Sequence, residues 1–547
     1  MKFVLSKIIY KYRLMVNNKL KLWLPLIFSI VMIGGMFLGY KMKEKMPATA
    51  RFFSAERKGT VQEVLDLISK RYVDPIQTDT LADAAIEEML SHLDPHSIFI
   101  PSSDLQQVNE DLAGKFEGIG IEFNIFNDTI HVLSVLKGSP SEDAGLHPGD
   151  KFLKIGDSTV AGNNTDSDEV KQLLRGLHGS KVQVTLLRGR EIKQFTITRG
   201  IIPLYSLDAG YMIAPATGYI RLNKFSETTY EEFMEAMQKL KENGVEKLIL
   251  DLRGNGGGIL QESVEIADEF LDGNKLIVYT QGDHVKKQEF RARREGIFEK
   301  GKLIVLIDEG SASASEVLTG ALQDWDRAEV IGRRSFGKGL VQEQYNLNDG
   351  SALRLTIARY YTPLGRSIQK PYDKGIESYN EELYDRYHNG ALINADSNKM
   401  ATGEPYHTPK GKLVYGGGGI TPDVFVAMDT TGISNKVAQL YTKNTIGNFV
   451  YRYYVDHIDH FKLFANPADF EKGFDIRHGG QVWNAFAAFA LHDSIKINTM
   501  PAADTQFIIR RLKSLFARQQ WRNEGFYEVN NAKDPMVIKA LEELNEQ

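Results

Sequence analysis

The spacing of hydrophobic and polar residues changes several times along the chain, and each change predicts a different kind of structure. Residues 22–40 are uncharged and mostly apolar. These nineteen residues, at about 1.5 Å each, nearly span a hydrocarbon core about 30 Å thick, which predicts one transmembrane helix. Residues 51–112 show helical spacing instead, with Val61, Val64 and Ile68 three and four positions apart. Within it, a second helical run that starts at Leu81 stops near Asp94, and the runs predict packing helices.

A β-rich pattern follows between about residues 116 and 200. Short apolar runs separated by turns predict strands at 119–125, 130–135, 152–155, 182–187 and 194–198, with one helix at 167–174. The pattern indicates a small β domain with little helix.

From residue 218 onwards, strands and helices alternate. Strands are predicted at 218–222, 247–252 and 303–307. Helices are predicted at 229–243, at 260–270 and from about residue 313. This alternation is typical of α/β architecture, in which active groups lie where buried strands lead into helices. Residues 436–547 are aromatic-rich and helical in pattern, with a clear amphipathic run at 507–516.

Composition excludes several classes of function. A chain of 547 residues should divide into several domains, and its net charge of −5 with no basic stripe gives no reason to expect nucleic-acid binding. There are no cysteines, so a thiol nucleophile, a disulfide framework and a cysteine-ligated metal are excluded. The twelve histidines form no His-Glu-x-x-His motif. We therefore expect neither a metal nor a cofactor.

The residues that flank segment 22–40 predict its orientation. Six basic residues and no acidic one precede the segment: Lys2, Lys7, Lys11, Arg13, Lys19 and Lys21. Fewer basic residues follow it, and Glu44 lies among them. The positive-inside rule then places residues 1–21 in the cytoplasm and the rest on the extracytoplasmic, periplasmic side of the cell membrane. A cleaved signal peptide is the alternative, because residues 48–50 read Ala-Thr-Ala.

Three short motifs carry the candidate chemistry. They are the glycine loop LDLRGNGGG at 250–258, the small-residue run GSASASE at 310–316 and the lysine between glycines in SFGKG at 335–339. A serine, a lysine and glycine-loop N–H groups are the parts of a serine–lysine hydrolase. The residues alone do not decide which of Ser311, Ser313 and Ser315 attacks. Taken singly, Ser313 and Lys338 also fit an ordinary helix start and an ordinary surface position.

The β-rich segment resembles a PDZ domain over about 85 residues. Its residues 138–140 and 144–150 resemble the PDZ signature, and FEGIGI at 116–121 resembles the PDZ carboxylate-binding loop. Glycines let consecutive N–H groups converge on a terminal carboxylate, which makes Gly118, Ile119, Gly120 and Ile121 the expected peptide-binding residues. Ile119 and Ile121 are expected to form the wall of a pocket for an apolar last side chain.

Taken together, residues 251–260, 309–316, 336–339 and 416–423 resemble the carboxyl-terminal processing peptidases, the tail-specific S41 serine peptidase family. LDPHS at 93–97 also resembles a sequence that this family carries ahead of its PDZ domain. The resemblance runs in order from about residue 60 to 430. It implies an α/β fold with a Clp-protease/crotonase-like peptidase core. The expected divisions are a basic tail (1–21), an anchor (22–40), a helical region (41–115), a PDZ domain (116–200), the peptidase core (201–430) and a helical extension (431–547).

The resemblance implies Ser313 as nucleophile, Lys338 as general base and Gln342 as the residue that orients the lysine. A lysine with an ordinary pKa of about 10.4 must be neutral to accept a proton, and lowering that pKa by ~3 units corresponds to roughly 4 kcal/mol. If residues 339–345 form a strand, Lys338 and Gln342 share one face. A neutral amide there can hold the amine without the charge that would keep it protonated.

Backbone N–H groups are expected to form the oxyanion hole. The choices are Ala314, directly after the nucleophile, and Gly256 or Gly257 in the glycine loop. Two other polar residues are interpreted as structural: Asp324 as a solvated aspartate at a helix end, although an acidic third residue has been proposed for the family, and His96 as a histidine at the end of a helix.

Three alternatives are weighed against this interpretation. The glycine loop lacks both phosphate-binding glycine patterns, so nucleotide binding has little support. The Gly-Asn-Ser-Gly-Gly sequence of high-temperature-requirement proteases is absent. An inactive PDZ adaptor that holds protein tails at the membrane remains the runner-up. Expected partners are proteins with free apolar C-termini and the membrane, and residues 431–547 could mediate a homodimer or recruit an adaptor.

Overall fold

The computed structural model describes residues 23–26, 28–37, 41, 59–394, 403–430 and 434–546. The chain divides into two compact units, residues 1–82 and 83–547. In the first unit, residues 23–26 and 28–37 are helical, α2 spans Thr60–Arg71, and α3 (Thr78–Ser91) begins. Among the described residues, no helix is both long and apolar enough to cross a bilayer. The predicted transmembrane helix at 22–40 is therefore not confirmed, and parts of it lie outside the described residues.

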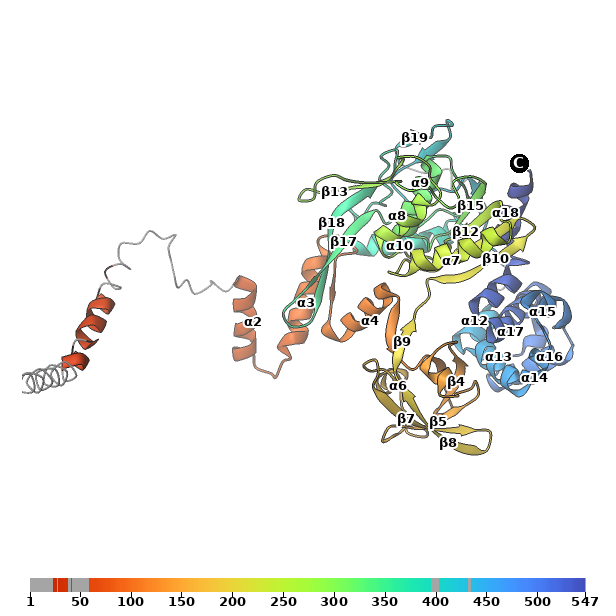
Figure 1. Ribbon diagram of the computed structural model, residues 1–547, viewed down its shortest axis with the longest axis horizontal. Coiled ribbons are helices and arrows are strands. Elements are labelled where there is room, and N and C mark those ends of the chain that lie inside the picture. Colours follow the sequence, from red (N-terminus) through yellow and green to blue (C-terminus); the bar gives the residue numbers. More distant parts are fainter. Residues whose placement is uncertain are drawn as a thin grey trace, which may run out of the picture. The chain divides into compact units, whose positions relative to one another are not determined.

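The second unit is built around a six-stranded sheet in the order β10-β11-β12-β15-β16-β21 (Figure 1). The strands are β10 (Leu207–Ala214), β11 (Thr217–Leu222), β12 (Lys247–Asp251), β15 (Lys302–Ile307), β16 (Glu329–Gly332) and β21 (Val424–Phe425). From β11 to β21 all neighbours are parallel, and only β10 is antiparallel to its neighbour. The predicted α/β core is confirmed.

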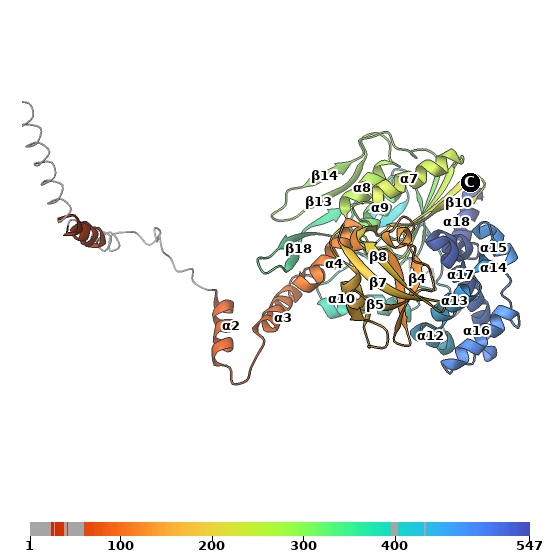
Figure 2. The ribbon, with the colours of Figure 1, turned by 60° about the horizontal axis from the view of Figure 1, so that its bottom comes forward.

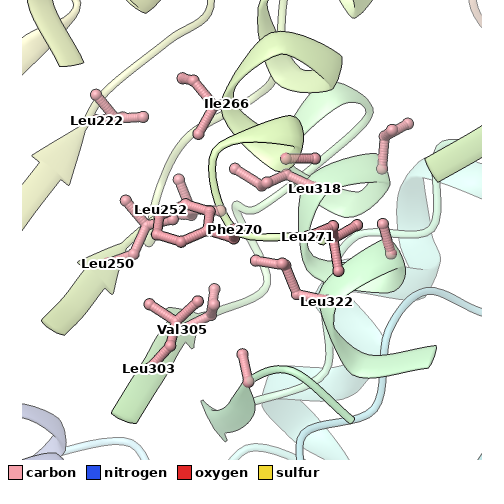
Figure 3. Packing of buried hydrophobic residues seen from close by; sticks show 14 of the residues in the cluster. Leu222, Leu250, Leu252, Ile266, Phe270, Leu271, Leu303, Val305, Leu318 and Leu322 are labelled. Atoms are coloured by element: carbon pink, nitrogen blue, oxygen red, sulfur yellow. The ribbon is translucent and has the colours of Figure 1, made fainter. Parts of the chain in front are cut away.

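Both faces of this sheet are covered, which explains why its strands read as continuous apolar runs. On one face Leu250, Leu252 and Val305 pack against α8 (Leu260–Asp268) and α9 (Ala314–Asp324) (Figure 3). Residues of α7 (Thr229–Glu242) belong to the same core. On the other face the sheet packs against α18 (Pro535–Glu546). Since β12 and β15 are adjacent and parallel, the loops after them meet at one edge of the sheet.

A second sheet contains the strand that follows Lys338. It contains β1 (Ile98–Ile100), β18 (Ala352–Tyr361), β13 (Leu276–Gln281), β14 (Gln288–Arg291) and β17 (Leu340–Asn346), which pairs with β18. Helix α10 (Ile376–His388) and the hairpin of β19 (Pro405–His407) and β20 (Leu413–Tyr415) complete this part of the core. The predicted strand at 339–345 is confirmed as β17.

The PDZ segment follows α4 (Ser102–Ala113) and is bracketed by β2 (Lys115–Gly118), which pairs with β9 (Gly200–Pro203). Its sheet contains β3 (Ile121–Phe126), β4 (Thr129–Val135), β5 (Lys151–Ile155), β6 (Ser158–Thr159), β7 (Lys181–Arg188) and β8 (Glu191–Thr198), with α5 (Pro140–Asp143) and α6 (Ser167–Leu174). The five predicted strands and the helix at 167–174 are confirmed. The first strand begins two residues later than predicted, because Ile119 and Gly120 belong to the loop before it.

The predicted helical C-terminal region is also confirmed (Figure 2). It comprises α12 (Asn435–Thr442), α13 (Thr445–Asp456), α14 (Ile458–Phe461), α15 (Pro467–Gly473), α16 (Gln481–His492), a 3-10 turn (Ile497–Thr499), α17 (Ala502–Asn531) and α18. The helices α12–α17 enclose an aromatic core of their own around Trp483, Phe486 and Phe516. Helix α17 changes direction at Trp521 and Arg522, where the backbone leaves helical geometry.

Candidate active site

Ser313 occupies a strained turn between β15 and α9. Its backbone has φ 55° and ψ −115°, a conformation that a non-glycine residue rarely adopts. Such strain is typical of a nucleophile held on a sharp strand-to-helix turn. The two neighbouring serines are fully buried and bonded elsewhere, because Ser311 Oγ donates to Leu252 O at 2.8 Å and Ser315 Oγ donates to Asn255 O at 2.9 Å. Of the three candidates, only Ser313 lines the pocket described below.

The glycine loop packs directly against Ser313. A Cβ atom on Gly257 would lie 2.7 Å from both Ala312 O and Ser313 Cβ, and the residue has φ 94°, so only glycine fits there. The N–H of Gly257 donates to Asn255 Oδ1 at 2.9 Å. This N–H is therefore engaged by the Asn255 side chain, and the choice between Gly256 and Gly257 for the oxyanion hole stays a prediction. Among the described residues, no acceptor engages the N–H of Gly256 or Ala314, which keeps both available.

An ion network anchors the start of this loop. Asp251 ends β12, is fully buried, and accepts bonds from Arg253 Nη2 at 2.6 Å and Tyr219 Oη at 2.6 Å. Burial acts to raise the pKa of Asp251, but the adjacent guanidinium groups of Arg221 and Arg253 hold it well below its usual range. Arg253 also pairs with Asp534, just ahead of α18, at 2.9 Å. The C-terminal segment thus braces the glycine loop from behind.

Lys338 and Gln342 meet as the strand prediction requires. Lys338 Nζ donates to Gln342 Oε1 at 2.9 Å. Burial lowers the pKa of Lys338 below its ordinary value of 10.5, and the charge of Arg354 lowers it further, while Asp94 and Glu316 act in the opposite direction. The amine is therefore shifted towards the neutral form that a general base needs.

Glu316 and Tyr360 fasten the Ser313 turn to the Lys338 segment. Glu316 is fully buried and accepts main-chain hydrogen bonds from Ser313 N and Lys338 N at 2.9 Å each and from Gly337 N at 2.8 Å. The Tyr360 hydroxyl contacts the carbonyl oxygens of Ser313, at 3.0 Å, and Lys338. Sequence reasoning gave neither residue a role. A local signal existed for Glu316, because Ser-Ala-Ser-Glu at 313–316 fits a capping box, but nothing local points to Tyr360.

One pocket of about 590 Å³ brings most of the predicted site together. Its lining includes Ser313, Lys338, Gln342, Gly256, Gly257 and Ala314. Apolar side chains form much of the remaining wall, among them Leu260 and Val317. Within the described residues, no hydrogen bond joins Ser313 Oγ to Lys338 Nζ, because the amine is directed to Gln342. The pocket thus holds the two groups without their direct contact.

The predicted peptide-binding loop lies at the start of β3. Gly120 has φ 77°, and a Cβ atom there would lie 2.4 Å from Ser139 Cβ. Ile119 is only 2% exposed and belongs to the PDZ core, and its expected place in the wall of a peptide pocket stays a prediction. Ile121 is half-buried and packs against that core. Gly118 pairs with Gly200 where β2 meets β9. Strand β3 lies at the edge of the sheet in this part of the described structure.

Three family models match the chain. Peptidase family S41 matches residues 216–378, and the PDZ domain matches residues 118–198. A family of unknown function matches residues 437–522. The carboxy-terminal processing protease CtpB of Bacillus subtilis (strain 168) is 36% identical over 361 residues, which cover 63% of this chain and 73% of that protein. The chain belongs to peptidase family S41.

This S41 member is also similar to two further proteins. A probable CtpA-like serine protease of Staphylococcus aureus (strain N315) is 37% identical over 321 residues, which cover 58% of this chain and 63% of that relative's length. A solved photosystem II D1 C-terminal processing protease is 29% identical, with a TM-score of 0.33, and the match covers 56% of this chain and 89% of that one. The S41 and PDZ models leave the C-terminal helices outside their matched ranges.

Asp324 differs from its sequence interpretation, whereas His96 does not. Asp324 is 1% exposed and accepts hydrogen bonds from Arg366 Nη2 at 2.5 Å and Leu364 N at 3.0 Å, so the description of a solvated aspartate is wrong. It forms a buried ion pair at the end of α9. His96 lies beside the site, because its carbonyl oxygen accepts a hydrogen bond from the amide of Gln342. In the part of the chain that the structure describes, no cluster of side chains suits a metal ion.

Proposed function

We propose that this S41 member is a serine endopeptidase that cleaves protein tails, with Ser313 as nucleophile and Lys338 as general base. The observation that carries the proposal is the single pocket that gathers a serine on a strained turn, a lysine with a lowered pKa and two unengaged N–H groups. No other pair of groups in this pocket combines a nucleophile with a base in that way. The activity needs neither histidine nor metal at the reacting bond.

The neutral Lys338 amine takes the proton of Ser313 Oγ as that oxygen attacks the peptide carbonyl. The N–H groups of Ala314 and Gly256 then face the developing oxyanion, and the protonated amine passes its proton to the leaving amine. Water, deprotonated by the same amine, resolves the acyl-enzyme. This sequence requires a hydrogen bond between the serine and the lysine. Because both side chains line one pocket, rotation about their side-chain bonds on substrate binding is the expected way to form it.

Gln342 stabilises the amine through its carbonyl oxygen without adding a negative charge. A carboxylate at this position would favour the ammonium form and oppose proton transfer. The apolar wall around Leu260 and Val317 suits an apolar substrate side chain next to the cleaved bond.

We further propose that the PDZ domain captures substrates by a free apolar C-terminus. The loop at 118–121 supplies the glycine-rich turn, and β3 presents an edge to which an extended peptide can add as another strand. Residues 22–40 are proposed to anchor the chain in the cell membrane with the peptidase on the extracytoplasmic side, on the strength of their apolar length and basic flank. A carbonate wash tests the anchor: an anchored chain stays with the membranes, and an N-terminus that starts after Ala50 would indicate signal-peptide cleavage.

Digestion of an unfolded reporter with an apolar C-terminus tests the peptidase. We expect Ser313→Ala and Lys338→Met each to lower kcat at least about 1,000-fold. Amidating the last carboxylate of the reporter should slow cleavage by the wild type if the PDZ loop recognises tails. Equal digestion by wild type and Ser313→Ala would overturn the peptidase proposal. Retention of the reporter without cleavage by either chain would favour the adaptor alternative.

A further inference from the structure

The LDPHS motif has no role in the proposed reaction, yet its last four residues lie against Gln342. We call residues 94–97 the DPHS turn; it connects α3 to β1. The carbonyl oxygen of His96, in this turn, accepts a hydrogen bond from Gln342 Nε2 across 246 positions of sequence. At its other end, Gln342 Oε1 accepts from Lys338 Nζ at 2.9 Å. The amide therefore bridges the DPHS turn and the lysine.

This bridge decides which way the Gln342 amide faces. A carbonyl oxygen can only accept, so His96 O selects the NH₂ end of the amide and leaves the oxygen for the lysine. The reversed amide would place two oxygens against each other at His96 and two sets of N–H donors against each other at Lys338. Either mismatch leaves polar groups without partners in a largely buried site, which costs free energy.

Asp94 holds the DPHS turn in the shape that presents this carbonyl. It is 7% exposed and accepts four hydrogen bonds. The donors are His96 N at 2.9 Å, Ser97 N at 3.0 Å, Ser97 Oγ at 2.6 Å and Thr356 Oγ1 at 3.0 Å. The first two define a tight turn closed by an aspartate side chain. The peptide unit that carries His96 O lies inside it.

The same carboxylate fastens the turn to the strand that faces Gln342. Thr356 of β18 is the register partner of Gln342 of β17. Thr356 donates through Oγ1 to Asp94 and through its main-chain N to Ser97 Oγ at 3.1 Å. The His96 ring adds a further contact, with Nε2 at 2.8 Å from Tyr379 Oη. Thr356 thus bonds the DPHS turn to the sheet at the position directly opposite Gln342.

We propose that Asp94 is a positioning residue for the peptidase reaction: it fixes the DPHS turn, the turn's carbonyl at His96 orients the Gln342 amide, and the amide holds the Lys338 amine. This inference rests on the proposed function. Residues 94–97 precede the ranges that the S41 and PDZ family models match. The inference therefore assigns a task to a motif that neither model covers.

The negative charge of Asp94 opposes the reaction, whereas its hydrogen bonds support the reaction by positioning the turn. Substitutions can therefore separate the two effects. As an anion near Lys338, Asp94 raises the pKa of the amine and so opposes the neutral form. If only charge mattered, removing it would help the reaction at neutral pH. A loss of activity must then come from lost positioning.

The variants Asp94→Asn and Asp94→Ala use this difference. Asparagine removes the charge but keeps the oxygen that closes the turn, whereas alanine removes both. In the full-length chain we expect Asp94→Ala to lower kcat about 10- to 100-fold with KM little changed, because misplacing a catalytic group by about 1 Å costs up to about 100-fold. Asp94→Asn should retain kcat within about 5-fold. Equal losses in both variants, or no loss in either, would overturn the proposal.

A double-mutant cycle with Gln342→Ala tests whether Asp94 acts through the glutamine. We expect Asp94→Ala to cost less than about 3-fold once Gln342 is absent, whereas the full loss in that background would contradict the inference. If Asp94→Ala does not fold, Ser97→Ala and Thr356→Val each remove one bond of the carboxylate and provide the same cycle. Ser97→Ala should reduce kcat by less than Asp94→Ala.

A crystal structure of the Asp94→Ala chain gives a readout independent of activity. We expect the Gln342 amide to leave His96 O and to turn away from Lys338; an unchanged amide would overturn the inference. If the Ser313→Ala chain cleaves as well as the wild type, the proposed function fails. The crystal structure still decides whether Asp94 positions Gln342, so the two failures are distinguishable.

Discussion

Ser313 and Lys338 donate their main-chain N–H groups to the same oxygen atom, Oε2 of Glu316, at 2.9 Å each. The other carboxylate oxygen accepts from Gly337 N at 2.8 Å and Ser335 Oγ at 2.5 Å. Burial raises the pKa of Glu316 to about 7, although these donated bonds oppose the rise. One buried carboxylate therefore fixes the separation between the backbones of the proposed nucleophile and base.

The first prediction concerns Glu316→Gln. Glutamine offers one acceptor oxygen to four donors, and its NH₂ group would face two of them, so the substitution should cost about 2–4 kcal/mol in the free energy of unfolding. We also expect kcat to fall more than about 10-fold, because the serine and lysine segments separate. Urea unfolding and reporter cleavage measure both effects. Glu381→Gln on the exposed side of α10 is the matched control, and an equal response in the two variants would contradict the assigned role.

The second prediction concerns the pH dependence of cleavage. Lys338 must be neutral, so kcat/KM should rise with pH until the pH passes the pKa of Lys338. Arg354 lowers that pKa and donates to Gln344 Oε1 at 3.0 Å. Arg354→Met removes the cation, which should raise the pKa of Lys338 and move the rising limb to higher pH. Arg354→Lys keeps the charge and should leave the limb close to that of the wild type; a Met variant with an unmoved limb would count against this electrostatic role.

The third prediction replaces the orienting amide with an anion. Gln342→Glu retains an oxygen for Lys338 but adds a charge that favours the ammonium form, so the rising limb should shift to higher pH than in the wild type. Glutamate also has no N–H to donate to His96 O. A pH profile of kcat/KM for this variant, beside one of Gln342→Ala, separates the charge from the lost bond. If the pH profiles of kcat/KM for Gln342→Glu and Gln342→Ala coincide, the added charge has no effect.

Much of the core could be predicted because its information is local. Buried parallel strands give continuous apolar runs, as at residues 247–252 and 303–307, and the glycine loop and serine run follow directly. Lys338 and Gln342 meet as expected, although β17 begins only at Leu340 and its register shifts between Val341 and Gln342. The helix at 167–174 was predicted with its bounds, since Asp166 provides a clear N-cap.

The remaining features depend on contacts between residues far apart in the sequence. Asp324 resembles any aspartate at a helix end until Arg366, 42 positions later, pairs with it. The N–H of Gly257 is indistinguishable in sequence from that of Gly256, and only the folded loop shows that Asn255 engages one of them. Tyr360 was missed for the same reason, because its partners Ser313 and Lys338 lie on other segments. Tertiary contacts of this kind leave no periodic signal.

The fourth prediction uses two histidines with lowered pKa values. Burial, and after it the charge of Lys338, lowers the pKa of His96 to about 4. Burial, and after it the charges of Lys151 and Arg452, lowers the pKa of His131 to about 4. Both are near 6.5 when unfolded, so between about pH 6.5 and 4 the unfolded chain binds more protons. Their contribution to stability is therefore fully present above pH 6.5 and is lost as the pH falls towards 4.

Urea unfolding at pH 7.5, 5 and 4 measures this loss, and comparison with a variant isolates one histidine from other titrating groups. His131→Gln cannot gain a proton, so its stability should fall less between pH 7.5 and 4 than that of the wild type. The exposed His92 provides the control, because His92→Gln should follow the wild type. A His131→Gln chain that loses as much stability as the wild type over this range would refute the prediction.

The fifth prediction concerns the contact between the PDZ domain and the C-terminal helices. Tyr451 of α13 stacks on Phe126 of β3, with ring centroids 5.4 Å apart and an angle of 5° between the planes, and His131 packs edge-on against both rings. Arg518 of α17 pairs with Glu122, also of β3, at 3.2 Å. Because aromatic pairs add about 0.5–1.5 kcal/mol beyond the area they bury, Tyr451→Ala should loosen the β3–β4 hairpin.

Hydrogen exchange of residues 121–135 measures this loosening. We expect faster exchange there in Tyr451→Ala, and a further increase when Arg518→Ala is added, because the two contacts hold opposite ends of the same strand. Tyr441→Ala, on α12 and partly exposed, removes a ring of the same size from the same group of helices and should leave the hairpin unchanged. Equal exchange in the Tyr451 and Tyr441 variants would mean that the stacked pair does not restrain the hairpin, and the contact between Arg518 and Glu122 would then be the remaining candidate.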